Sequence, residues 1–205
     1  CPTQAIDVDG PAISVQRDQC LGCGLCLHAC PAEVFATKRW SERTPLANVE
    51  ELETKGVEFF CKLHPHPETG QRKSGGMQIP TCLVAMSPGA WFELGLKQVV
   101  RLRLDACAQC PLANTVSAIE AAAATANDWL HDAGYEPQIT CIHMVTDLEK
   151  LVKRPVISAE RVRMTRRGFF RSLFATTEPQ PEDTEPAELT WTGEESPKNQ
   201  PRLPA

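Results

Sequence analysis

The chain has 205 residues, a formal net charge of −5 and ten cysteines. This length suits one modest domain with appendages or two small domains, and the acidic balance argues against nucleic acid as a partner. No apolar run approaches the length of a membrane span, and no signal peptide is visible. The grouped cysteines therefore indicate metal binding in a reducing compartment, which we expect to be the cytoplasm.

The most informative segment lies near the N-terminus and contains four closely spaced cysteines. The run from Cys20 to Pro31 reads C-x-x-C-x-x-C-x-x-x-C-P, the spacing that holds cubane iron–sulfur clusters in bacterial ferredoxins. Gly22 and Gly24 are expected to let the backbone approach the inorganic sulfides closely. The alternative, a zinc knot, prefers two separated C-x-x-C pairs. The spacing therefore predicts a [4Fe–4S] cluster.

Residues 1–35 resemble the C-terminal half of a bacterial-type two-cluster [4Fe–4S] ferredoxin domain, so we expect a domain of that type over 1–36. Cys1-Pro2 resembles the closing C-P of a first motif, and two alternating runs around Asp9-Gly10 are typical of a β-hairpin. The resemblance implies a partial α+β ferredoxin-like segment, in which the last cysteine of each motif ligates the cluster of the other motif. The implied ligands of one cluster are Cys1, Cys20, Cys23 and Cys26, and Cys30 is implied to serve the second.

The second cluster of that family would need three further ligands upstream of residue 1. Because the sequence starts in mid-motif and without methionine, we expect a fragment of a longer protein. A second cluster then forms only if upstream ligands exist. The rival interpretation is a processed chain whose Cys1 is lipidated, as in bacterial lipoproteins, but Cys1-Pro2 fits the ferredoxin pattern better.

The middle of the chain, residues 44–153, alternates predicted helices and strands. We expect a helix that begins at Thr44 and ends at Gly56, a second that begins after Ser87, and a third over 112–133. A capping box at Thr146 and Glu149 predicts a last short helix. The alternation indicates a small α/β domain with a mainly parallel sheet. Strands are predicted at 57–60, around 78–79, at 98–104 and at 139–144, with a Pro-, His- and Gly-rich loop running from 61 to 76.

The composition changes twice after this domain. Residues 154–174 are basic and predict a helical segment, which either docks on a partner or packs its aromatic residues on its own domain. Residues 175–205 are acidic and rich in proline and threonine with few aliphatic residues, which predicts a disordered tail.

A second set of cysteines follows the predicted strands and consists of Cys61, Cys82, Cys107 and Cys110. Because the carboxyl ends of parallel strands share one edge of a sheet, these thiols are expected to converge there. They would diverge if the strands before Cys61 and Cys82 were antiparallel. The layout of residues 56–145 faintly resembles the iron–sulfur subunits of hydrogenase and heterodisulfide reductase complexes.

Three interpretations of this second set stay open. It binds a further iron–sulfur cluster or a zinc ion, or Cys107 and Cys110 form a thioredoxin-like dithiol whose pKa is lowered at a helix N-terminus, or the thiols are plainly buried. Cys141 falls in mid-strand and is predicted to lie in the core. His64 and His66 are interpreted as parts of a solvated turn rather than as metal ligands.

The sequence therefore predicts an iron–sulfur electron-transfer protein, or the electron-transfer subunit of a larger oxidoreductase complex. Its partners would be redox proteins, and an electron carrier is favoured over an enzyme, with no catalytic residue assigned. Two other classes remain: a zinc-stabilised interaction module, and a thiol–disulfide oxidoreductase that uses Cys107 and Cys110.

Overall fold

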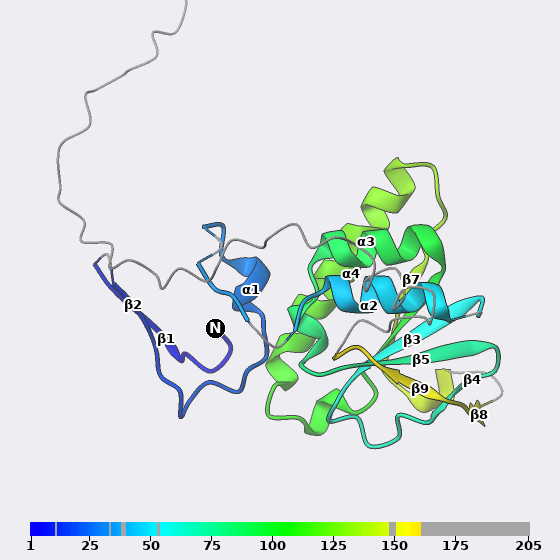
Figure 1. Cartoon of the computed structure of the whole chain (residues 1–205), viewed down its shortest axis with the longest axis horizontal. Helices are drawn as coiled ribbons and strands as arrows, with labels where there is room; N and C mark the ends of the chain where they lie inside the picture. Colours follow the sequence, from blue (N-terminus) through cyan, green and yellow to red (C-terminus); the bar gives the residue numbers. More distant parts are fainter. Residues whose placement is uncertain (11, 33, 38–39, 53, 148–150, 161–205) are drawn as a thin grey trace, which may run out of the picture. The chain divides into compact units, whose positions relative to one another are not determined.

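The N-terminal segment forms a hairpin followed by a short helix. A computed structural model describes residues 1–160 apart from residues 11, 33, 38–39, 53 and 148–150 (Figure 1). Strands β1 (Ile6–Asp9) and β2 (Ala12–Val15) pair antiparallel, which confirms the predicted hairpin. The hairpin turns at Gly10, which has a φ of +56°. Helix α1 (Cys26–Ala29) follows within the cysteine motif.

A five-stranded parallel sheet forms the centre of the molecule (Figure 1). Its strand order is β7-β6-β3-β5-β9, and every neighbouring pair is parallel. The structure thus confirms the predicted α/β class with a mainly parallel sheet. A separate antiparallel pair joins β4 (Thr69–Gln71) to β8 (Leu151–Lys153). The sheet strands are β3 (Gly56–Cys61), β5 (Ser74–Ile79), β6 (Val99–Arg103), β7 (Ile139–Ile142) and β9 (Val156–Ser158).

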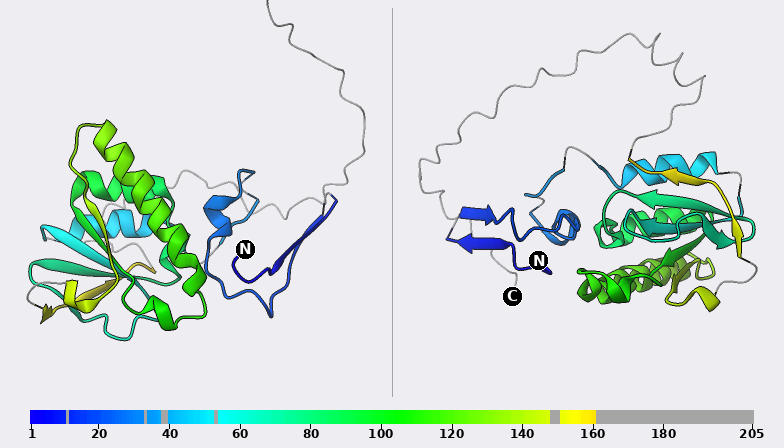
Figure 2. Two further views of the ribbon diagram at one scale, coloured as in Figure 1. Left: turned by 180° about the vertical axis from the view of Figure 1, so that it is seen from behind. Right: turned by 90° about the horizontal axis from the view of Figure 1, so that it is seen from below.

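Three helices lie together along the sheet: α2 (Arg43–Asn48), α3 (Pro88–Lys97) and α4 (Val116–Asp132) (Figure 2). Helix α3 packs against both α2 and α4, and α4 packs against β7. Because side chains alternate along β3, Val57 and Phe59 point to one face, where the Phe59 ring meets Trp91 of α3 edge-on at a centroid distance of 5.3 Å. The core therefore lies between the helices and this face of the sheet.

Glu58 lies between Val57 and Phe59 in β3, so its side chain points to the opposite face of the sheet, where it is fully buried. Its carboxylate accepts hydrogen bonds from Arg103 Nη1 (3.2 Å), Arg154 Nη2 (2.7 Å) and the backbone N–H of Gln71 (2.7 Å). Arg103 also donates two hydrogen bonds to Asp105, at 2.7 and 2.9 Å. These buried charges are therefore paired, and they tie β3 to β4, to β6 and to Arg154, which lies two residues before β9.

Two helix ends follow from local sequence. Ser87 caps α3, because its hydroxyl accepts a hydrogen bond from the backbone N–H of Ala90 (3.1 Å) and Pro88 takes the first helical position. The helix predicted over 112–133 instead begins as a separate 3-10 turn, η4 (Ala113–Thr115), before α4. Gly134, with a φ of +82°, ends it as expected.

The structure corrects two predictions before β5. Helix α2 ends at Asn48 and continues only as the 3-10 turn η1 (Val49–Glu51), so Gly56 begins β3 instead of ending a helix. The loop expected to run to residue 76 contains β4 and the first half of β5. The glycine at position 75 is not typical of a strand, which is why β5 was not predicted there. A Cβ on Gly75 would lie 2.9 Å from the Leu52 side chain, so the close approach of that side chain favours glycine in mid-strand.

The C-terminal predictions are also corrected where the structure describes the chain. Residues Leu151–Lys153 form β8 instead of the last helix; Thr146 lies in the 3-10 turn η5 (Val145–Asp147), and Glu149 lies outside the described residues. Strand β9 extends the sheet beyond residue 153, where a basic helix was expected over 154–174. Residues 161–174 and the predicted disordered tail at 175–205 lie outside the described residues. Within residues 1–160 as described, every helix is too short or too polar to cross a bilayer.

Candidate metal centre

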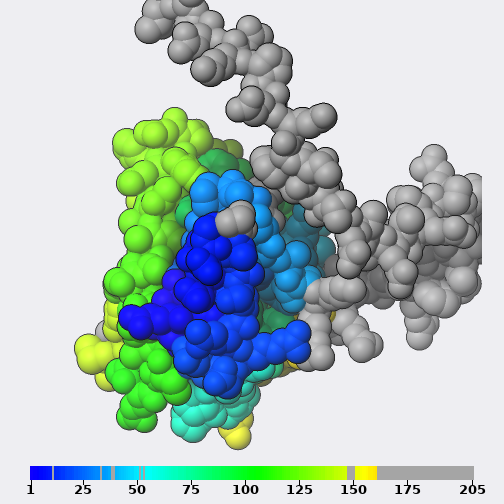
Figure 3. All heavy atoms as spheres, turned by 90° about the vertical axis from the view of Figure 1, so that its left-hand side faces the viewer, coloured from blue at the N-terminus to red at the C-terminus, as the bar shows by residue number. Residues whose placement is uncertain are grey.

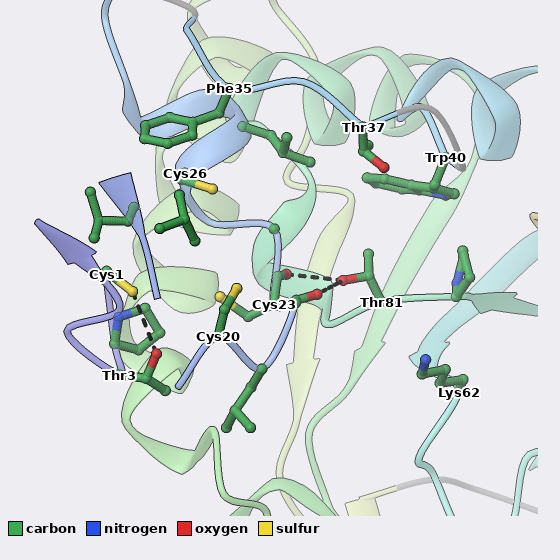
Figure 4. Close-up of a pocket in the computed structure, with 18 of the residues that line it drawn as sticks. Cys1, Thr3, Cys20, Cys23, Cys26, Phe35, Thr37, Trp40, Lys62 and Thr81 are labelled. Carbon is green, nitrogen blue, oxygen red and sulfur yellow. Dashed lines mark hydrogen bonds between the residues drawn. The ribbon is translucent and has the colours of Figure 1, made fainter. Parts of the chain in front are cut away.

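Four cysteines of the N-terminal segment line one cavity of about 740 Å³ (Figure 4). Cys1 precedes the hairpin, Cys20 and Cys23 lie in the loop after β2, and Cys26 begins α1. Cys30 caps the C-terminal end of α1 and is not among the residues that line the cavity. The structure therefore brings together the four thiols that the ferredoxin resemblance groups, and it leaves Cys30 outside their cavity.

The loop that carries these thiols is fixed against the sheet edge. The Thr81 hydroxyl lies 2.8 Å from the carbonyl oxygen of Gly22 and 3.1 Å from that of Cys23 (Figure 4). Gly22 and Gly24 have φ values of +62° and +84°, which favour glycine. A Cβ on Gly24 would lie only 2.5 Å from the Cβ of Ala85, so this glycine also permits close contact with the 3-10 turn η2 (Leu83–Ala85).

Two further contacts position the N-terminal segment. The Nε2 of His28 lies 2.7 Å from the carbonyl oxygen of Val84, which joins α1 to η2. The side-chain amide of Asn114 donates to the carbonyl oxygen of Pro2 at 3.0 Å. Figure 3 looks onto this side, where the blue N-terminal segment lies beside the green chain that contains η4. The contact of His28 with Val84 therefore positions α1, and His28 is not among the residues that line the cavity of the four thiols.

The second set of cysteines meets at the carboxyl edge of the sheet. Cys61 ends β3, Cys82 follows β5, and Cys107 begins the 3-10 turn η3 (Cys107–Gln109) after β6. The condition for their convergence is met, because β3 pairs parallel with both β5 and β6. All three line a second cavity, of about 70 Å³, together with Cys110.

Cys107 does not have the lowered pKa that was predicted for a dithiol. Burial, together with the charges of Cys61, Cys82 and Cys110, raises the pKa of Cys107 to about 12. The expected helix effect is wrong because Cys107 lies in η3, whereas the long helix α4 begins only at Val116. A nucleophilic thiol needs a lowered pKa, so this arrangement disfavours thiol–disulfide exchange.

Among the described residues, no group of three or more His, Cys, Asp or Glu side chains is placed to hold a single metal ion.

His64 was predicted to lie in a solvated turn, and the structure shows it buried. Its Nε2 lies 3.3 Å from Asp105 Oδ1, and its Nδ1 accepts the backbone N–H of His66 at 3.2 Å. Burial by itself would raise the pKa of Asp105, but hydrogen bonds from Arg103 and His64 hold it well below its usual range. His64 is therefore part of the buried charged cluster.

Two cationic residues at the site were not predicted from the sequence. Lys62 lines both cavities, and Arg103 lines the smaller one. Lys62 could have been suspected because it directly follows Cys61. Arg103 gave no such signal, because its alternation with apolar residues in β6 is also typical of a solvent-facing strand position.

The fold and its cavities define a protein with two thiol-lined cavities beside a parallel α/β sheet. A family model described as the LdpA Fe-S cluster-binding domain matches residues 1–40. These residues are thus an iron–sulfur cluster-binding domain, and the implied cofactor is an iron–sulfur cluster. No curated protein and no solved structure matches the chain.

Proposed function

We propose that this chain is an iron–sulfur electron-transfer protein, or the electron-transfer subunit of a redox complex. In this proposal, a [4Fe–4S] cluster is held by Cys1, Cys20, Cys23 and Cys26. The observation that carries it is the single cavity that these four thiols line, together with their ferredoxin spacing. When bound, such a cluster accepts and releases single electrons.

The chain's own residues position these thiols and set their surroundings. Burial raises the pKa of Cys23 and Cys26, and neighbouring thiols raise it further, so four free thiolates are unfavourable without a cation. The Thr81 contacts hold the loop that carries Cys23. Cys30 lies outside the cavity, which agrees with the ferredoxin arrangement in which the last cysteine serves the other cluster.

Anaerobic reconstitution with iron and sulfide tests this proposal. We expect brown protein, an electron paramagnetic resonance signal after reduction with dithionite, and loss of about four iron and four sulfide ions per chain in the variant C20S/C23S. The control is Cys141→Ser, because Cys141 lies in β7 and lines neither cavity. Protein that stays colourless and free of iron contradicts the proposal.

The two other predicted classes give different results in the same preparation. A zinc-stabilised interaction module would hold zinc with no sulfide. A thiol–disulfide oxidoreductase would exchange disulfides in the metal-free protein and lose this activity in Cys107→Ser. The raised pKa of Cys107 disfavours the thiol–disulfide oxidoreductase.

A further inference from the structure

We propose that Cys61, Cys82, Cys107 and Cys110 bind a second iron–sulfur cluster at the carboxyl edge of the sheet. This site is separate from the cluster proposed above, since none of its four cysteines belongs to the N-terminal motif. The sequence separates them by up to 49 positions, from 61 to 110, and the parallel pairing of β3 with β5 and β6 brings them to one cavity.

The four thiols are close neighbours around one cavity. Each thiol interacts electrostatically with the other three. Among the described cysteines all are free of disulfides, so these thiols are available as ligands. Four thiolates around a small enclosed space are the ligand set of [2Fe–2S] and [4Fe–4S] clusters.

Two of these sulfurs have a hydrogen-bond partner among the described residues. The backbone N–H of Leu112 donates to Cys110 Sγ at 3.5 Å, and the Thr115 hydroxyl lies 3.6 Å from Cys82 Sγ. Hydrogen bonds to sulfur of this kind hold thiolate ligands and tune iron–sulfur clusters.

The lining of this cavity includes one cationic group that has no carboxylate beside it in the same lining: Lys62 contributes an ammonium, and no aspartate or glutamate is among the described residues that line the cavity. Arg103 also lines it, but its guanidinium is paired with Glu58 and Asp105. The remaining wall is apolar and includes Leu83 of η2 and Ile119 of α4. A cluster with four thiolates carries net negative charge, which such a wall accommodates better than an acidic one would.

The second site lies directly beside the first. The two cavities share the loop Leu21-Gly22-Cys23, with Lys62 and Thr81, and Cys23 interacts electrostatically with Cys82. The two proposed clusters would therefore be neighbours across this loop. With both clusters bound, the chain would be an electron carrier with two adjacent redox centres.

The test compares metal content in the full chain after anaerobic reconstitution. The variant C20S/C26S removes two ligands of the first site, neither of which lines the second cavity, and is expected to keep iron and acid-labile sulfide in the second site. The variant C107S/C110S is expected to lose that second portion and to keep the first. Cys141→Ser is the control, because burial also raises the pKa of Cys141, to about 11, yet this thiol lines neither cavity.

The outcomes separate this inference from the proposed function. If C20S/C26S holds no iron, the second site fails while the first cluster stands; if it keeps all of the wild-type iron, the first fails. Stoichiometric zinc without sulfide in that variant also overturns the second cluster. Should C107S/C110S lose its fold by circular dichroism, the C20S/C26S result still decides, because every cysteine that lines the second cavity remains in it.

Discussion

Glu58 shows how strongly a single residue can depend on its partners. Its carboxylate is buried without solvent contact between Arg103 and Arg154, and both guanidinium groups are themselves almost fully buried. The favourable pairing compensates the desolvation of these charges, so the cluster is stable only when all its members are present. Burial lowers the pKa of Arg154, and the charge of Glu58 opposes that effect.

Replacing Glu58 with alanine tests this dependence. The substitution leaves two buried cations without their carboxylate, and we expect the free energy of unfolding to fall by about 3–5 kcal/mol in urea titrations. Lys97→Ala is the matched control, since Lys97 forms surface ion pairs with Glu50 and Glu93. That variant should unfold almost as the wild type does. Equal losses in the two variants would contradict the importance of the buried cluster.

At the scale of elements, helix α3 places one aromatic side chain, Trp91, in the core beside the buried Ala90 and Leu94 of the same helix. Trp91 is fully buried and contacts Phe59 of β3, whereas Trp129 of α4 is 44% exposed and contacts Phe92 at a ring distance of 6.1 Å. Both residues looked like helix-face core residues in the sequence. The structure separates them, because only Trp91 lies between α3 and the sheet.

A pair of tryptophan substitutions measures this difference. Trp91→Ala opens a cavity in the core and is expected to lower the free energy of unfolding by about 3–5 kcal/mol. Trp129→Ala removes a half-exposed ring and one aromatic contact, which we expect to cost about 1 kcal/mol. Thermal or urea unfolding followed by circular dichroism gives both values. A larger loss for Trp129→Ala would mean that α4, rather than α3, holds the helices to the sheet.

Elements with strong local signals were predictable from the sequence. The hairpin at Asp9-Gly10, the cap at Ser87 and the strand that ends in Cys61 depend on residues adjacent in the chain, and all three are confirmed. Strand β9 could not be predicted, because its three residues are too few for a periodic pattern and it forms through its pairing with β5.

The candidate site divides in the same way into predictable and unpredictable residues. The spacing of the N-terminal cysteines is local and was read from the sequence, whereas the position of Arg103 depends on tertiary packing.

At the scale of the whole molecule, the residues after 153 complete the sheet. Strand β9 is one edge of the sheet, and the buried backbone N–H of Ala159 donates to the carbonyl oxygen of Gln78 at 2.8 Å. Arg154 adds hydrogen bonds to the carbonyl oxygens of Ser74 and Gly75. Because β5 leads directly to Cys82, this edge supports the strand that positions one of the proposed ligands.

Two shortened chains test whether this segment belongs to the folded unit. A chain that ends at Lys153 loses β9 and the pairing of Arg154 with Glu58, so we expect the free energy of unfolding to fall by at least about 3 kcal/mol. A chain that ends at Arg163 keeps every contact described above and should unfold at the urea concentration of the full chain. The chain that ends at Lys153 should also bind less iron than the chain that ends at Arg163. The shorter chain lacks Glu160, which lines the larger cavity, and it lacks the strand that pairs with β5, which leads to Cys82 in the smaller cavity. If the two shortened chains unfold at the same midpoint and bind equal iron, β9 is dispensable, and the sheet is held by the four strands from β7 to β5.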